Sequence, residues 1–88
     1  MKQTVIIINK LGLHARAAAL LATTAARFSS EVQVGYDGKM VDAKSVMSLM
    51  LLAASKGTEL DINVEGADKI QAMETIIELI NDRFTEDE

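Results

Sequence analysis

The sequence predicts an α+β domain in which strands and helices follow the order βαββαβα, with three helices packed on one face of a four-stranded sheet. First, the spacing of apolar residues switches along the chain between the strand period of two and the helical spacing of three and four. Second, Asp37-Gly38 separates two short β-branched segments, as in a hairpin. Third, a chain of 88 residues is long enough for one compact core, and it contains no proline to interrupt a helix or strand. We therefore expect a single domain over residues 1–88.

The first strand and the first helix follow from composition. Gln3 to Ile8 carries β-branched residues at nearly every step, which predicts a strand covered on one face. From Ala15 to Phe28 the chain is rich in alanine and leucine, which are good helix formers. The apolar stripe of this helix consists of Ala18, Leu21, Ala22, Ala25 and Phe28.

A hairpin and a second helix come next. Val32, Val34 and Tyr36 alternate with polar or small residues, and the strand over residues 39–41 follows the turn. The segment from Lys44 to Ala54 returns to helical composition and ends near Gly57. Ser45 suits its N-cap because a serine hydroxyl can accept a hydrogen bond from a free amide of the first turn.

The last strand and the last helix have the clearest periods. Leu60, Ile62 and Val64 alternate with polar residues, so one face of this strand should be buried. Asp68 followed by Gln71 resembles a capping box that opens the final helix. The helical stripe that follows consists of Ile70, Met73, Ile76, Ile77, Ile80 and Phe84.

Charge and composition exclude several classes of function. Nine Lys and Arg against 13 Asp and Glu give a net charge of -4, which argues against a nucleic-acid partner; three of the acids end the chain at residues 86–88. No cysteine is present, so disulfides and thiolate metal sites are excluded and a reducing cytosol is the simplest location. The apolar run Val5 to Ile8 is too short for a signal peptide or a membrane span.

The segment from Leu11 to Arg16 joins the first strand to the first helix and holds the only histidine, His14. A helix N-terminus offers free amides and the positive end of the dipole, which favour an anion such as phosphate. The same field favours a neutral imidazole, whose free lone pair is needed to accept a phosphoryl group. Arg16 adds a planar cation that can bind two phosphate oxygens, and Gly12 permits a tight turn.

The residues alone also fit a plainer interpretation, in which His14 is an ordinary polar residue at a helix start. Other chemistries are less well supported. The chain has no second histidine for a transition-metal site and no glycine-rich phosphate loop, and Phe28, Tyr36 and Phe84 are its only aromatic residues. Both interpretations of His14 stay open at this level.

Residues 9–16, Asn-Lys-Leu-Gly-Leu-His-Ala-Arg, resemble the active-site signature of the HPr family. These are the histidine phosphocarriers of the bacterial phosphoenolpyruvate-dependent sugar phosphotransferase system. The similarity continues in order along the chain. Residues 37–39 resemble the family's hairpin, residues 44–47 its regulatory-serine segment and residues 65–68 the start of its final helix.

This resemblance implies an open-faced sandwich with an antiparallel sheet. It also implies that enzyme I, charged from phosphoenolpyruvate, phosphorylates Nδ1 of His14, which then donates to an enzyme IIA domain. Arg16 would stabilise the phosphate, and the protein would be a covalent carrier rather than an enzyme, without cofactor or metal. The family's sugar-uptake and nitrogen-related branches use similar carriers. Ala17 stands where many relatives have proline, and we expect the site to be retained because alanine also suits a first helical turn.

The resemblance further suggests regulation at Ser45 by an HPr kinase/phosphorylase. A module that is purely regulatory, acting through Ser45 alone, is the second hypothesis. The segment after Ser45 is more apolar than one helix face requires, so an exposed partner surface beside His14 is expected. Its predicted members are Ala15, Val46, Met47 and Met50, with Arg27 and Lys44 as candidate contacts for acidic partners. We expect a monomer.

Overall fold

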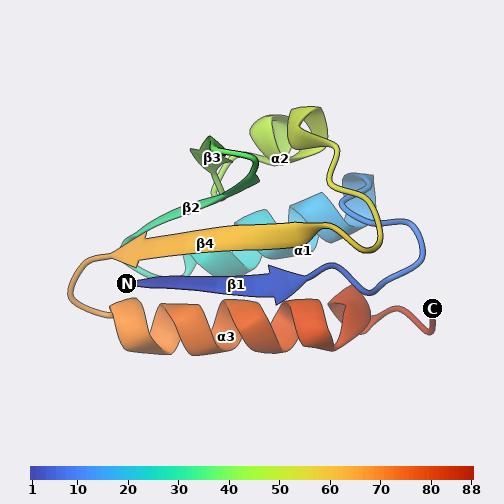
Figure 1. Cartoon of the computed structure of the whole chain (residues 1–88). Coiled ribbons are helices and arrows are strands. Elements are labelled where there is room, and N and C mark those ends of the chain that lie inside the picture. Colours follow the sequence, from blue (N-terminus) through green and yellow to red (C-terminus); the bar gives the residue numbers. More distant parts are fainter.

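The structure is a computed structural model that describes all residues from Met1 to Glu88. Its elements are β1 (Lys2–Ile6), α1 (Ala15–Ala26), β2 (Glu31–Tyr36), β3 (Lys39–Asp42), α2 (Val46–Leu52), β4 (Glu59–Glu65), α3 (Lys69–Asn81) and a 3-10 turn, η1 (Arg83–Thr85) (Figure 1). The predicted order βαββαβα is confirmed. Because each helix returns the chain to the same sheet, one core serves all of the elements.

The strands form one antiparallel sheet in the order β1-β4-β2-β3. Strand β4 lies between β1 and β2, so Leu60 pairs with Val5 and Val64 pairs with Val32. The inward side chains of β4 are fully buried, as their alternation predicted. Helices α1 and α3 contact each other, and α2 contacts α1 and β3.

The core consists of 22 buried hydrophobic residues drawn from the sheet and all three helices. Helix α1 contributes mostly small side chains, its buried residues being Ala17, Ala18, Leu21, Ala22 and Ala25. Alanine permits close approach of the helix backbone to its neighbours, so α1 is held firmly along its length. That rigid packing fixes the position of its first turn.

Three predicted boundaries are wrong. Strand β1 ends at Ile6, because the amide of Ile7 donates to Thr58 O outside the sheet and Ile7 is buried beyond the strand. Helix α1 ends at Ala26, and Phe28 is only partly buried. Helix α2 ends at Leu52, where Ala53 adopts the left-handed conformation, rather than near Gly57.

The final helix also differs from its prediction. It ends at Asn81, and Phe84 reaches the core from a left-handed turn rather than from a continuous helical stripe. Ile70 is exposed. The predicted capping box is absent, since the Asp68 carboxylate instead accepts hydrogen bonds from the amides of Ser29 and Ser30 and from the Ser30 hydroxyl. Asp68 therefore ties the loop before β2 to the start of α3.

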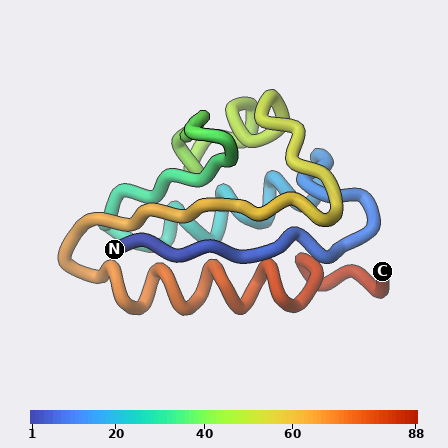
Figure 2. The backbone as a smooth tube through the Cα atoms, in the orientation of Figure 1, coloured from blue at the N-terminus to red at the C-terminus, as the bar shows by residue number.

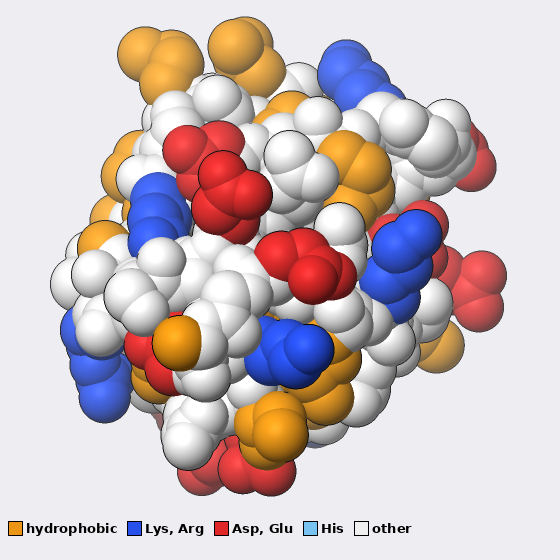
Figure 3. All heavy atoms as spheres, turned by 90° about the vertical axis from the view of Figure 1, so that its left-hand side faces the viewer, with side chains coloured by type: hydrophobic (Ala, Val, Ile, Leu, Met, Phe, Trp, Pro, Cys, Tyr) orange, Lys and Arg blue, Asp and Glu red, His pale blue; other side chains and the backbone are white.

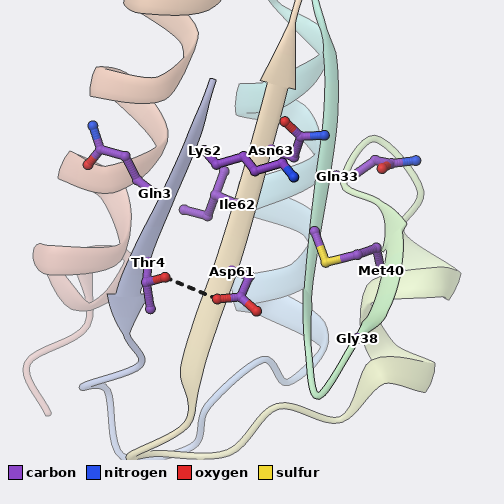
Figure 4. Close-up of a pocket in the computed structure, with 9 residues that line it drawn as sticks. All are labelled: Lys2, Gln3, Thr4, Gln33, Gly38, Met40, Asp61, Ile62 and Asn63. Carbon is purple, nitrogen blue, oxygen red and sulfur yellow. Dashed lines mark hydrogen bonds between the residues drawn. The ribbon is translucent and has the colours of Figure 1, made fainter.

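The outer face of the sheet is polar and carries a shallow hollow of about 420 Å³. Figure 4 shows its side chains, among them Lys2, Gln33 and Asn63, with Thr4 Oγ1 donating to Asp61 Oδ1 at 3.0 Å. The end of the molecule away from the C-terminus intersperses acidic and basic side chains (Figure 3). Acidic, basic and uncharged side chains are mixed in both regions, so neither forms a patch of a single charge.

Candidate functional site

The loop between β1 and α1 is fixed against the chain that follows α2. Leu13 N donates to Ala54 O at 2.9 Å, and Gly57 N donates to Ile7 O at 2.8 Å. Gly12 has φ +64°, and a Cβ there would lie 2.5 Å from Ala54 O. Glycine is therefore required twice over at position 12, by conformation and by space. The loop delivers the next residues to the start of α1 in one defined position.

His14 is the N-cap of α1, but its side chain makes no capping hydrogen bond. Its backbone carbonyl accepts from Ala18 N at 2.8 Å, which starts the helix. The amides of residues 15–17 have no acceptor within the protein. Free amides at the positive end of the helix dipole favour a bound anion.

Both ring nitrogens of His14 lie near an acceptor. Nδ1 is 3.1 Å from the Gly12 carbonyl oxygen, and Nε2 is 3.0 Å from Glu86 Oε2. The His14 side chain is 29% exposed, so it is partly accessible to a partner.

Arg16 lies beside His14, as predicted, but its guanidinium is already engaged. Nη1 donates to Phe84 O and to Glu86 Oε2, both at 3.2 Å, and Nη2 donates to Thr85 Oγ1 at 2.9 Å. His14 and Arg16 therefore share the same carboxylate oxygen. An anion bound between them would have to share Arg16 with the C-terminal segment.

This C-terminal contribution was missed by the sequence analysis, which noted only that acidic residues end the chain. Figure 2 shows that the residues after α3 continue to the end of the molecule where the loop between β1 and α1 also lies. Phe84 anchors them in the core, Lys10 N donates to Glu88 O at 2.8 Å and Lys10 Nζ lies 3.3 Å from Glu88 Oε2. No local pattern links residues so far apart in sequence.

Asn9 lies in the segment that resembles the family signature, but the sequence analysis predicted no role for it. It is fully buried, and its Nδ2 donates to Gly12 O at 2.8 Å and to Glu86 Oε1 at 3.1 Å. A buried amide needs hydrogen-bond partners, and the partners of this one belong to the surroundings of His14. The signal in the sequence was a polar residue directly after an apolar run. A hollow of about 560 Å³ lies over these groups, lined by residues that include Lys10, His14, Arg16 and Glu86.

The predicted partner surface is exposed beside His14. Met47 is 68% exposed, and Ala15, Val46 and Met50 are also exposed. Met50, Ala15 and His14 line one shallow hollow, so the site and α2 form a continuous surface. Two further exposed apolar residues, Leu11 and Leu51, were not predicted to belong to it.

Three other predicted residues, Ser45, Lys44 and Arg27, have partners within the protein. Ser45 is the N-cap of α2, and its Oγ accepts from Ser48 N at 3.2 Å, which confirms the predicted cap. Lys44 Nζ donates to Phe28 O at 2.9 Å, and the Arg27 guanidinium lies 5.9 Å from the centre of the Phe28 ring.

No group of three or more His, Cys, Asp or Glu side chains lies close enough together to hold a metal ion. None of the helices has the length and apolar character needed to cross a membrane.

Comparisons with known proteins identify the family of this chain. A family model described as "PTS HPr component phosphorylation site" matches residues 1–82. The chain is 49% identical over 88 residues to phosphocarrier protein HPr of Neisseria meningitidis serogroup B, covering 100% of this chain and 99% of that protein. Both aligned sequences therefore correspond over nearly their full length.

Solved structures give the same result. HPr of Thermoanaerobacter tengcongensis has a TM-score of 0.95 and 42% identity, covering 100% of this chain and 99% of that one. A structure described as an HPr dimer from the same organism has a TM-score of 0.79 and 45% identity, with coverages of 98% and 100%. The chain belongs to the HPr family, the phosphocarrier proteins of the phosphotransferase system.

Proposed function

We propose that His14 is the residue that carries the phosphoryl group, accepting it on Nδ1 from enzyme I charged by phosphoenolpyruvate and donating it to enzyme IIA domains. The observation that supports this most directly is the uncapped start of α1, where the amides of residues 15–17 have no acceptor. A nucleophilic ring and an anion site coincide there.

The transfer itself requires little rearrangement of covalent structure. The Nδ1 lone pair of His14 attacks phosphorus, a new P–N bond forms, and the bond between phosphorus and the donor breaks, so that the donor keeps the electron pair of that bond. The phosphoryl oxygens gain hydrogen bonds from the free amides and from Arg16, which is permanently charged. Positioning and charge therefore carry the reaction, as expected when a protein transfers a phosphoryl group without a metal of its own.

Partners dock on the adjoining apolar surface formed by Ala15, Val46, Met47 and Met50. Methionine side chains are flexible and adapt to different surfaces, which suits a carrier that must meet a donor and several acceptors in turn. Small interfaces of modest affinity then allow each partner to leave quickly. One chain supplies both the site and this surface, so a monomer is sufficient for the transfer, and we place this carrier in the cytosol.

Regulation at Ser45 by an HPr kinase/phosphorylase is part of the same proposal. The Ser45 hydroxyl makes only one weak hydrogen bond at a partly exposed helix start. A phosphate there would favour the α2 dipole while adding negative charge beside the partner surface. Docking of an acidic partner would be opposed.

Incubation with phosphoenolpyruvate and enzyme I tests the carrier function. We expect a mass gain of one phosphoryl group that is lost on acid treatment, since phosphohistidine is acid-labile and phosphoserine is not. His14→Ala should abolish the gain, and Arg16→Ala should slow it by roughly tenfold to a hundredfold because a charge-assisted contact is lost. No gain in the wild type, or a gain that survives in His14→Ala, contradicts the proposal. An acid-stable gain that is lost in Ser45→Ala assigns the modification to Ser45.

A further inference from the structure

Methionine supplies all of the sulfur in this chain, which has five methionines and no cysteine. The five side chains differ widely in exposure. Met73 is fully buried in the core, and Met1 and Met40 are partly buried. Met47 is 68% exposed and Met50 is 43% exposed, and both lie on α2. The two most accessible sulfur-bearing side chains therefore belong to one short helix.

Both of these side chains belong to the surface beside His14. Met47 and Met50 are three positions apart, which places them on the same face of α2. Met50 lines one hollow together with His14. The surface on which partners are proposed to dock is therefore built around two thioethers, and a chemical change at their sulfur atoms would alter it directly.

A thioether is oxidised by a peroxide wherever the oxidant can reach the sulfur. With hydrogen peroxide, the Sδ lone pair attacks one oxygen, and an S–O bond forms as the O–O bond breaks. The hydroxide that leaves takes the proton of the transferred oxygen and becomes water. Sulfur loses two electrons and the peroxide gains them. The product, methionine sulfoxide, is polar and accepts hydrogen bonds.

We propose that Met47 and Met50 are the most readily oxidised residues of this chain, and that their conversion to sulfoxides by a peroxide weakens the docking of partner proteins while leaving His14 intact. The inference rests on the proposed function of the surface around His14. A sulfoxide covered by an apolar partner surface loses its hydrogen bonds to water without gaining others, which lowers the affinity.

Oxidation at these two positions leaves the supports of α2 in place. The side of the helix that faces the core carries Leu49 and Leu52, which are fully buried. At its start, Ser45 Oγ accepts from Ser48 N, and at its end the Tyr36 hydroxyl donates to Leu52 O at 2.9 Å. None of these contacts involves sulfur, so the change is confined to the exposed surface.

The first measurement is the rate of oxidation at each methionine, obtained by peptide mapping after timed exposure of the whole chain to dilute hydrogen peroxide. We expect Met47 and Met50 to gain oxygen first. Met73 should react about tenfold more slowly or less, because its sulfur is reached only when the core opens.

The second measurement follows removal of the peroxide and compares two phosphoryl donors. Phosphoramidate is a small donor that needs no docking surface, whereas enzyme I must dock. In the oxidised protein the KM for this chain with enzyme I should rise about tenfold, while the rate with phosphoramidate should change less than about twofold, since the sulfoxides lie in the docking surface. Methionine sulfoxide reductase should restore the KM, because sulfoxide formation is reversible.

Two matched variants separate these sulfurs from the others. The double variant Met47→Leu, Met50→Leu keeps an apolar surface without sulfur, and Met40→Leu removes a methionine of the outer sheet face. Each variant is compared with itself before and after exposure to peroxide. Peroxide should leave the KM of the double variant unchanged, whereas Met40→Leu should show the same rise as the wild type.

Three outcomes overturn the inference. They are oxidation of Met73 as fast as that of Met47 and Met50, an unchanged KM once both exposed methionines are oxidised, and a rise of the KM in the double variant. Loss of reactivity with phosphoramidate also contradicts it, because the damage then includes His14. Failure of the proposed function looks different, since the untreated wild type then accepts no phosphoryl group from enzyme I and the inference fails with it.

Discussion

Helices α1 and α2 begin in opposite ways, although they contact each other. At the start of α2, the Ser45 hydroxyl accepts from Ser48 N and closes the first turn. At the start of α1, the equivalent position holds His14, whose ring points to Glu86 and Gly12 and leaves the first amides free. Only one of the two helix starts is therefore ready to receive an anion.

The difference shows how function and stability are separated in this small domain. A capped start contributes stability but has no spare donors, whereas an uncapped start gives up that contribution and keeps its donors for a ligand. Stability around α1 comes instead from its buried alanine face and from the loop that carries Gly12. The comparison can be tested from each side.

The largest effect is expected from Gly12→Ala, which displaces the start of α1. A Cβ there meets Ala54 O at 2.5 Å and Ser55 Cα at 2.8 Å, in a backbone conformation with φ +64°. We expect the free energy of unfolding to fall by about 2 to 4 kcal/mol from strain and overpacking together. Urea unfolding measures this.

Gly57→Ala is the control for Gly12→Ala. It has φ +92° but no atom within 4 Å of the added Cβ, so only the conformational cost of about 1 to 2 kcal/mol remains. Equal losses in the two variants contradict the steric account of Gly12.

A smaller effect is expected from exchanging caps. Ser45→Ala should lower the free energy of unfolding by about 1 kcal/mol, because the Ser48 amide loses its acceptor. At the start of α1 the matched comparison is His14→Ser against His14→Ala. The serine variant should be about 1 kcal/mol more stable, since its hydroxyl caps amides that are free in the wild type. Equal thermal and urea stability of these two variants means that the α1 amides are not free.

The smallest effect concerns the start of α3, where Asp68 binds a neighbouring loop instead of its own helix. The Ser30 hydroxyl, with the amides of Ser29 and Ser30, lowers the pKa of Asp68 from 3.8 to about 2. A carboxyl whose pKa is lower in the folded state stabilises the fold while it is ionised. The contribution is therefore complete above about pH 4 and is lost as the pH falls towards 2.

Ser30→Ala should flatten the dependence of unfolding free energy on pH between about 4 and 2, since the largest cause of the shift is removed. Urea titrations at several pH values in this window make the comparison. An unchanged slope in Ser30→Ala shows that Asp68 is not stabilised by this hydroxyl.

Local sequence was sufficient for the element order, for the Ser45 cap and for the hairpin, in which Asp37 and Gly38 both adopt positive φ. These features depend on residues within a few positions of one another. The prediction of a capping box at Asp68 was wrong because the Asp68 carboxylate accepts tertiary hydrogen bonds from the amides of Ser29 and Ser30 instead.

The site was predictable only in part, for the same reason. His14 and Arg16 were found because both lie in one short segment at a helix start. The roles of Asn9 and Glu86 were missed because the hydrogen bond between them spans 77 positions. The left-handed turn that directs Phe84 into the core contains no glycine, so the sequence carries no signal for it. Such contacts emerge only when the whole fold is assembled.

The contacts around His14 link the loop before α1 to residues after α3 that lie about 70 positions further along the chain. Contacts of such long range require a large loop to close before they can form. The surroundings of His14 are therefore complete only when the segment after α3 has docked against the loop before α1.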